Sequence, residues 1–90
     1  MAAEGACRAC VEAIYVLLRK QGMPIPGNHA EESERLSMLD EIYPSLNLSA
    51  RYLMLFQNLH TNCFYHGNCG VIKDWFVNAR KFVDDIAKVL

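Results

Sequence analysis

The clearest pattern in the sequence is carried by residues 71–90, VIKDWFVNARKFVDDIAKVL. Apolar side chains recur there every three or four positions, at Ile72, Trp75, Phe76, Ala79, Phe82, Val83, Ile86 and Leu90. This spacing is that of one face of an α-helix. Charged residues of both signs fill the opposite face, so the stretch predicts an amphipathic helix with a solvated outer side.

Two further segments with helical periodicity lie at the start of the chain, and neither alternates as a strand does. The first covers about residues 3–21 and stops at Gly22, which suits the left-handed end of a helix. The second begins after Asn28, whose spacing to Glu31 is that of a capping box. Pro44 ends this second helix, because proline lacks a backbone donor.

The third helical segment runs from about residue 46 to residue 65, with Ser45 or Asn47 as its expected cap. Turn residues at positions 66–70 separate it from the last helix. Four helices joined by short connections predict an all-α fold, an antiparallel four-helix up-and-down bundle. Residues 1–90 are expected to form one domain, because the chain is too short for a second.

The third helix carries more apolar residues than one packed face needs. Leu53, Met54 and Phe64 lie outside its main stripe. A chain of 90 residues buries only about 60–65% of its unfolded surface, yet 52% of these residues are hydrophobic. A second copy would cover such a surplus, so we expect a homodimer that forms through the third helix.

Several classes of partner are excluded by composition. The net charge is −1 and the sequence has no lysine–arginine stripe, so we expect no binding to a DNA duplex. The sequence shows neither an export signal nor an apolar run of about 18 residues, and we expect a cytoplasmic protein that does not enter the membrane. In that compartment Cys7, Cys10, Cys63 and Cys69 would be mostly reduced.

The densest group of chemically active residues lies in residues 59–69. His60, Cys63, His66 and Cys69 recur at every third position, and thiolates and imidazoles are the preferred ligands of zinc. A three-residue step on an α-helix rotates the side chain by about −60°, so Cys69 would drift away from the other ligands. A zinc-stabilised bundle is therefore only a weak alternative, and we expect no metal or cofactor.

The pair Cys7-x-x-Cys10 has the spacing of a redox motif. Such motifs normally follow a strand and open a helix, and no strand precedes this one. We therefore expect both cysteines to be buried core residues.

A catalytic alternative uses His60 with Arg51 and Asn62 in metal-independent RNA cleavage. The imidazole would take the 2′-hydroxyl proton and the guanidinium would stabilise charge on the phosphate. Arg51 and His60 are nine positions apart, so on one helix they point in opposite directions about 13 Å apart. They could serve one site only across a twofold dimer. Nearby Tyr65, His66 and His29 are the candidate binding residues.

The chain resembles the HEPN superfamily of small helical bundles, with its closest likeness to the archaeal PaREP-type branch. The shared outline is a first helix ending in Leu17-Leu18-x-x-x-Gly22, His29 at the start of the second helix, and Phe82-Val83-x-x-Ile86 in the last. The most specific part is Leu59-His60-x-Asn62-x-x-Tyr65.

The resemblance implies a bundle of four or five helices that usually dimerises. Some HEPN proteins are toxin or defence ribonucleases, whose arginine precedes the histidine by four to six positions. No arginine stands at that distance before His60 or His66. The resemblance therefore implies a binding or assembly module, either the non-catalytic partner of a minimal nucleotidyltransferase or a member of unknown activity. A ribonuclease that acts on RNA as a dimer is the alternative.

Overall fold

The computed structural model describes residues 3–90 and contains no β-strand within them. The helices are α1 (Ala3–Lys20), α2 (His29–Ile42), α3 (Leu48–Leu55) and α4 (Ile72–Ala87). A short 3₁₀ turn, η1 (Pro44–Leu46), precedes α3, and a π-helix, η2 (Phe56–Tyr65), continues α3 without a break. The prediction of an all-α, four-helix fold is confirmed, and the packing is consistent with an up-and-down bundle.

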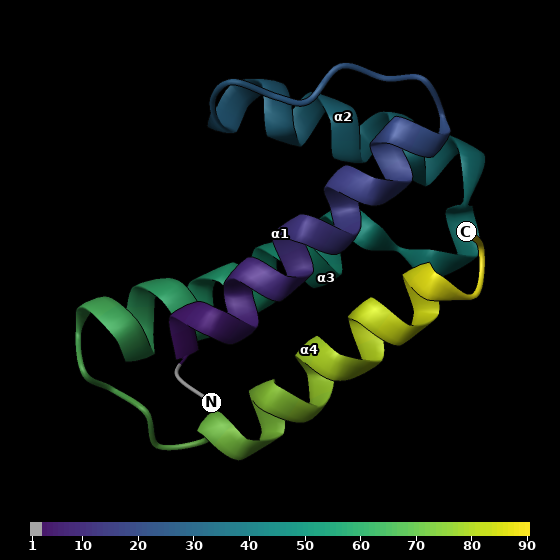
Figure 1. The fold of residues 1–90 in the computed structure, drawn as a ribbon. Helices are drawn as coiled ribbons and strands as arrows, with labels where there is room; N and C mark the ends of the chain where they lie inside the picture. The colour runs from purple at the N-terminus through teal and green to yellow at the C-terminus, as the bar shows by residue number, and fades with distance from the viewer. Residues whose placement is uncertain (1–2) are drawn as a thin grey trace.

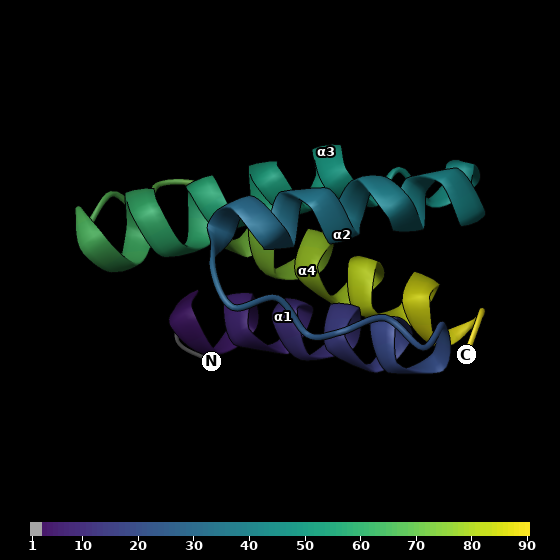
Figure 2. The same cartoon turned by 90° about the horizontal axis from the view of Figure 1, so that it is seen from above.

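The helices form two layers. In Figure 2, α2 and α3 lie above α1 and α4, and Figure 1 shows α4 running beside α1. α1 packs against α4 and η2, whereas α2 packs mainly against α3. The fully buried side chains at the centre come from several of these elements, and they include Cys10, Ile14, Leu17, Leu39, Leu48, Leu59, Phe82 and Ile86. Within residues 3–90, no helix is long and apolar enough to cross a membrane.

The predicted end of α1 and the predicted start of α2 are both present. Gly22 has a φ of 72°, and the N–H of Met23 donates to the carbonyl of Leu18 at 2.9 Å, which is the bond of a Schellman-type helix end. At the start of α2, the Asn28 side chain accepts from the N–H of Glu31 at 2.9 Å. The Glu31 carboxylate accepts in turn from the N–H of Gly27, one residue earlier than in a capping box.

The cap of α3 differs from the prediction. Asn47 stands at the N-cap position with a φ of 50°, but its side chain makes no capping hydrogen bond, and Ser45 lies within η1. The carboxylate of Asp40 on α2 takes this role. It accepts from the N–H of Leu48 at 2.8 Å and, at 3.3 Å, from that of Ser49. A side chain near the end of α2 therefore caps the start of α3, which packs against it.

The prediction of an ordinary α-helix as far as residue 65 is wrong from Phe56 onward. Residues Phe56–Tyr65 form a π-helix, in which each N–H bonds the carbonyl five residues earlier. The amide of His66 still follows this pattern, donating to Thr61 at 3.2 Å. At the junction the Asn58 side chain donates to the carbonyl of Met54 at 2.8 Å, in place of the backbone bond of an α-helix.

The cap that Asp40 provides predicts a measurable contribution to stability. Asp40→Ala should lower the free energy of unfolding by about 1 kcal/mol, because it leaves two amides at the start of α3 without a partner. The matched control is Glu41→Ala, at the neighbouring exposed position, which should change the stability by less than about 0.5 kcal/mol. Urea unfolding followed by circular dichroism measures both, and equal losses would contradict the assignment.

Candidate functional site

His60 is held by an acidic residue from the opposite end of the sequence. Its Nδ1 lies 2.8 and 3.0 Å from the two carboxylate oxygens of Glu4, in the first turn of α1. Both side chains are partly buried. A carboxylate only accepts, so Nδ1 is the donor and its partner fixes the ring orientation. Nε2 is then the ring nitrogen that Glu4 does not engage.

Aromatic rings surround His60 along one side of η2. The His60 ring centroid lies 4.7 Å from that of Phe56, 5.8 Å from that of Phe64 and 4.9 Å from that of Tyr65. The ring of His29, at the start of α2, packs nearly perpendicular to that of Phe56, with the two centroids 5.7 Å apart. Three of the predicted site residues, His60, Tyr65 and His29, therefore belong to one aromatic cluster.

Arg51 is not part of this cluster. Its guanidinium bonds Asp85 on α4 at 3.1 Å and the carbonyl of Leu46 at 3.0 Å, and it lies over the ring of Phe82. His60 and Arg51 thus have different partners on different helices.

The two remaining predicted residues lie near the end of η2. Asn62 faces a shallow hollow together with Asn58 and Trp75, and its carbonyl accepts from the N–H of Asn68 at 2.8 Å. His66 is exposed at the end of η2. Neither makes a described contact with the ring of His60.

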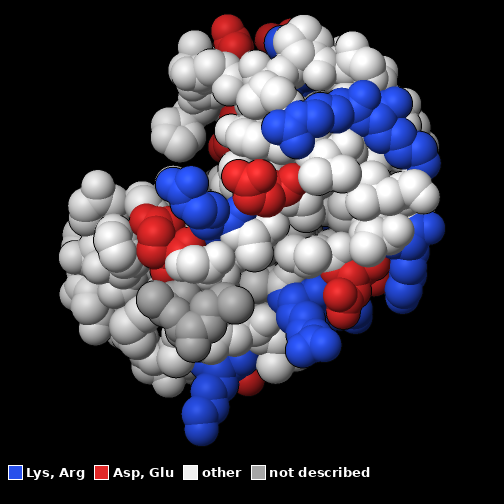
Figure 3. Space-filling view, in the orientation of Figure 1, with Lys and Arg blue, Asp and Glu red and all other residues white. Residues whose placement is uncertain are grey.

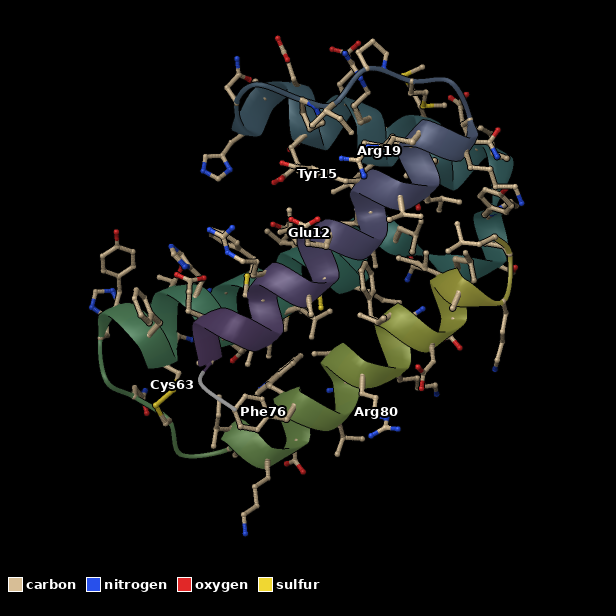
Figure 4. All side chains as sticks on the ribbon, in the orientation of Figure 1. Glu12, Tyr15, Arg19, Cys63, Phe76 and Arg80 are labelled. Atoms are coloured by element: carbon tan, nitrogen blue, oxygen red, sulfur yellow. A yellow bond between two sulfur atoms is a disulfide. The ribbon has the colours of Figure 1, made fainter. Side chains whose placement is uncertain are left out.

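The expectation that the four cysteines are mostly reduced is wrong for Cys63 and Cys69, which form a disulfide with Cα atoms 4.6 Å apart. The chain turns back at Gly67, whose φ of 70° lies in the left-handed region that glycine favours. Figure 4 shows this sulfur bridge beside the labelled Cys63. The weak zinc alternative loses two of its four ligands to the bridge, and no group of three or more metal-binding side chains occurs within residues 3–90.

Cys7 and Cys10 are free thiols in the core, as expected. Burial raises the pKa of Cys7 to about 11 and that of Cys10 to about 12. The Cys10 thiol donates to the carbonyl of Ala79 on α4. Thiolates are the reactive form, so these groups are packing residues and lack the low pKa of a redox cysteine.

Three partners of His60 were not predicted: Phe56, Phe64 and Glu4. The spacing of Phe56, His60 and Phe64, each four residues from the next, is the signal that could have indicated a row of rings. Glu4 stands 56 positions away from His60, and no local pattern connects the two. Their pairing depends on how α1 packs against η2.

The cysteine assignment predicts the result of a thiol titration. Unfolded without reductant, the chain should react with two equivalents of a thiol reagent at Cys7 and Cys10, and with four after reduction. The folded chain at pH 8 should react far more slowly, because both free thiols are buried. Four reactive thiols in the unreduced unfolded chain would contradict the bridge.

Removing the bridge should also cost stability. Cys63→Ser combined with Cys69→Ser should lower the free energy of unfolding by about 2 kcal/mol, the loop-closure effect of so short a ring. The matched control is the unmodified chain with and without reductant, which should show the same loss. An unchanged denaturation midpoint in both comparisons would contradict a structural role for the bridge.

The chain matches no protein-family model, no curated protein and no solved structure. The site is therefore described from its own residues: a partly exposed aromatic cluster around a histidine that Glu4 orients, on a helix whose turns are wider than those of an α-helix.

Proposed function

We propose that the protein is a helical binding and assembly module that forms a homodimer through the outer surface of α3 and η2. We define this α3–η2 surface by the exposed residues of that stretch: Ala50, Leu53, Met54, Gln57, Phe64 and Tyr65. All six side chains are uncharged. This uncharged surface is the observation that carries the proposal.

The large apolar members of this surface are well exposed, with Leu53 at 63%, Phe64 at 53% and Tyr65 at 70%. Between Leu48 and Tyr65 the only Lys, Arg, Asp or Glu is Arg51, and its charge is paired with Asp85. The centres of protein interfaces are depleted of charge and enriched in aromatic residues and methionine. An uncharged surface of this length is unusual for a helix that faces water on one side.

Other exposed apolar residues lie among charges. Val77 on α4 is exposed, but Lys73, Asp74, Arg80 and Lys81 share its helix face or flank it. Val16 on α1 is followed by Arg19 and Lys20. These isolated side chains are ordinary surface features and need no partner.

A second copy suits the surface better than an unrelated partner, because an apolar, uncharged helix face is complementary to itself about a twofold axis. A stable interface buries about 800 Å² per partner, or about one seventh of the 5450 Å² surface of this chain. Dimerisation would also supply burial that a chain of 90 residues lacks.

The resemblance to HEPN bundles supports the same proposal, since such bundles usually dimerise. A minimal nucleotidyltransferase as a further partner stays a prediction. The ribonuclease alternative gains no support from the geometry, because Arg51 is occupied by Asp85 and lies apart from the His60 cluster.

The proposal predicts the mass of the particle in solution. Light scattering after size exclusion should give twice the monomer mass of 10.2 kDa. Leu53→Glu should weaken the dimer at least about a hundredfold, because it buries unpaired charge in the interface. The control Val77→Glu places the same charge at an equally exposed position on α4 and should leave the dimer intact.

A chain that stays monomeric at high micromolar concentration would contradict the proposal. So would equal dissociation by Leu53→Glu and Val77→Glu. The circular dichroism spectrum of each variant separates loss of the dimer from loss of the fold.

A further inference from the structure

A cleft opens beside the aromatic cluster, between the first half of α1, the start of α2 and the junction of α3 with η2. Its volume is about 430 Å³, within the range of small-molecule sites. Tyr15, Tyr52, Phe56 and His60 are among its lining residues. Figure 3 shows the molecule hollowed between α2 and the lower helices, with acidic and basic atoms at the hollow. In Figure 4, Glu12 and Tyr15 project from α1 toward this space.

Glu32 brings a largely buried carboxylate to this cleft. Its side chain is only 15% exposed. Its one ionic neighbour within residues 3–90 is Nδ1 of His29 at 3.7 Å, too long for a hydrogen bond, on a ring that is 84% exposed. Burying a carboxylate is costly unless it is paired, and its place near the positive end of α2 offsets only part of that cost. The Glu32 carboxylate therefore has no close ionic partner within residues 3–90, and its oxygens are open to the cleft.

Tyr52 brings a second polar group, its hydroxyl, to the same cleft. The residue is 94% buried (6% exposed), and we find no hydrogen bond to its hydroxyl within residues 3–90. Burial, followed by the charge of Glu32, raises its pKa far above the ordinary tyrosine value, so the hydroxyl stays protonated. Ser49 Oγ is the one fully buried side-chain oxygen without a hydrogen-bond partner within residues 3–90, so the Tyr52 hydroxyl is open to the cleft. It can therefore accept a hydrogen bond from a bound ligand.

Both unpartnered groups offer oxygen acceptors, and a ligand with several N–H donors would satisfy them together. The charges favour a positive ligand, because Glu4, Glu12 and Glu32 line the cleft against Arg8 alone. The carboxylate of Glu4 already accepts a hydrogen bond from His60, so Glu12 and Glu32 are the acidic residues that remain for a ligand. The partly exposed ring of Phe56, whose centroid lies 6.0 Å from that of Tyr52, provides an aromatic surface that attracts cations.

We propose that this cleft binds a small organic cation that carries an alkylammonium or guanidinium group, with Glu32 as its charge partner and Tyr52 as a second acceptor. This inference does not depend on the dimer. The two acceptors and the aromatic walls all belong to one chain.

A pair of matched ligands tests the charge requirement. Butylguanidinium and neutral butylurea have nearly the same shape and differ in charge, and butylammonium separates the guanidinium from the ammonium. In an amide NMR titration at low salt, butylguanidinium or butylammonium should shift the resonances of residues around Glu32, Tyr52 and Phe56 saturably. Butylurea should shift them at least about tenfold more weakly. Equal binding of the neutral ligand, or shifts confined to other surfaces, would overturn the proposal.

A pair of matched variants tests the site. Glu32→Gln should weaken binding at least about tenfold, whereas Glu34→Gln should leave it unchanged. Both remove one negative charge from α2, but Glu34 points outward with its side chain 68% exposed. Equal weakening by both would mean nonspecific attraction and would overturn the site.

Tyr52→Phe keeps the ring and removes the hydroxyl, so it should weaken binding about threefold or more with the fold preserved. This variant decides the question if Glu32→Gln fails to fold. Unchanged affinity in Tyr52→Phe would then overturn the proposed acceptor.

Discussion

The structure depends on the burial of one apolar face of α1. Cys10, Ile14 and Leu17 are fully buried where α1 meets α4 and η2. At about 25 cal/mol per Å² of apolar surface, such burial is the main favourable term in the folding of so small a chain. It also places the polar side of α1. Glu4 accepts a hydrogen bond from His60, and Glu12 and Tyr15 line the cleft beside α2.

The continuous helix α3–η2 has a buried inner side and an exposed outer side. Its inner side buries Leu48, Leu55 and Leu59 in the core, and its outer side leaves uncharged residues in water. The wider turns begin at Phe56, where the aromatic cluster begins. π-helical turns are rare and frequently occur at functional sites, which fits their position here between the proposed dimer surface and the proposed cation cleft.

Local rules account for what could be predicted. Gly22 ends α1 and Asn28 caps α2 as predicted, and both act within a few residues. The turn predicted at positions 66–70 likewise separates η2 from α4. The features that were missed depend on distant contacts. Asp40 caps a helix eight residues away, and Glu4 meets His60 across 56 positions. The Cys63–Cys69 bridge was missed because a cytoplasmic protein was expected, in which thiols stay mostly reduced.

The central claim is that two copies meet through the α3–η2 surface, and contacts between copies test it most directly. Isotope-filtered nuclear Overhauser spectra of a mixture of labelled and unlabelled chains report only those contacts. The account predicts intermolecular signals from the side chains of Leu53, Met54 and Phe64, which are exposed in the single chain. Signals from Val16 or Val77 instead, or none at a concentration where the mass is that of a dimer, would contradict it.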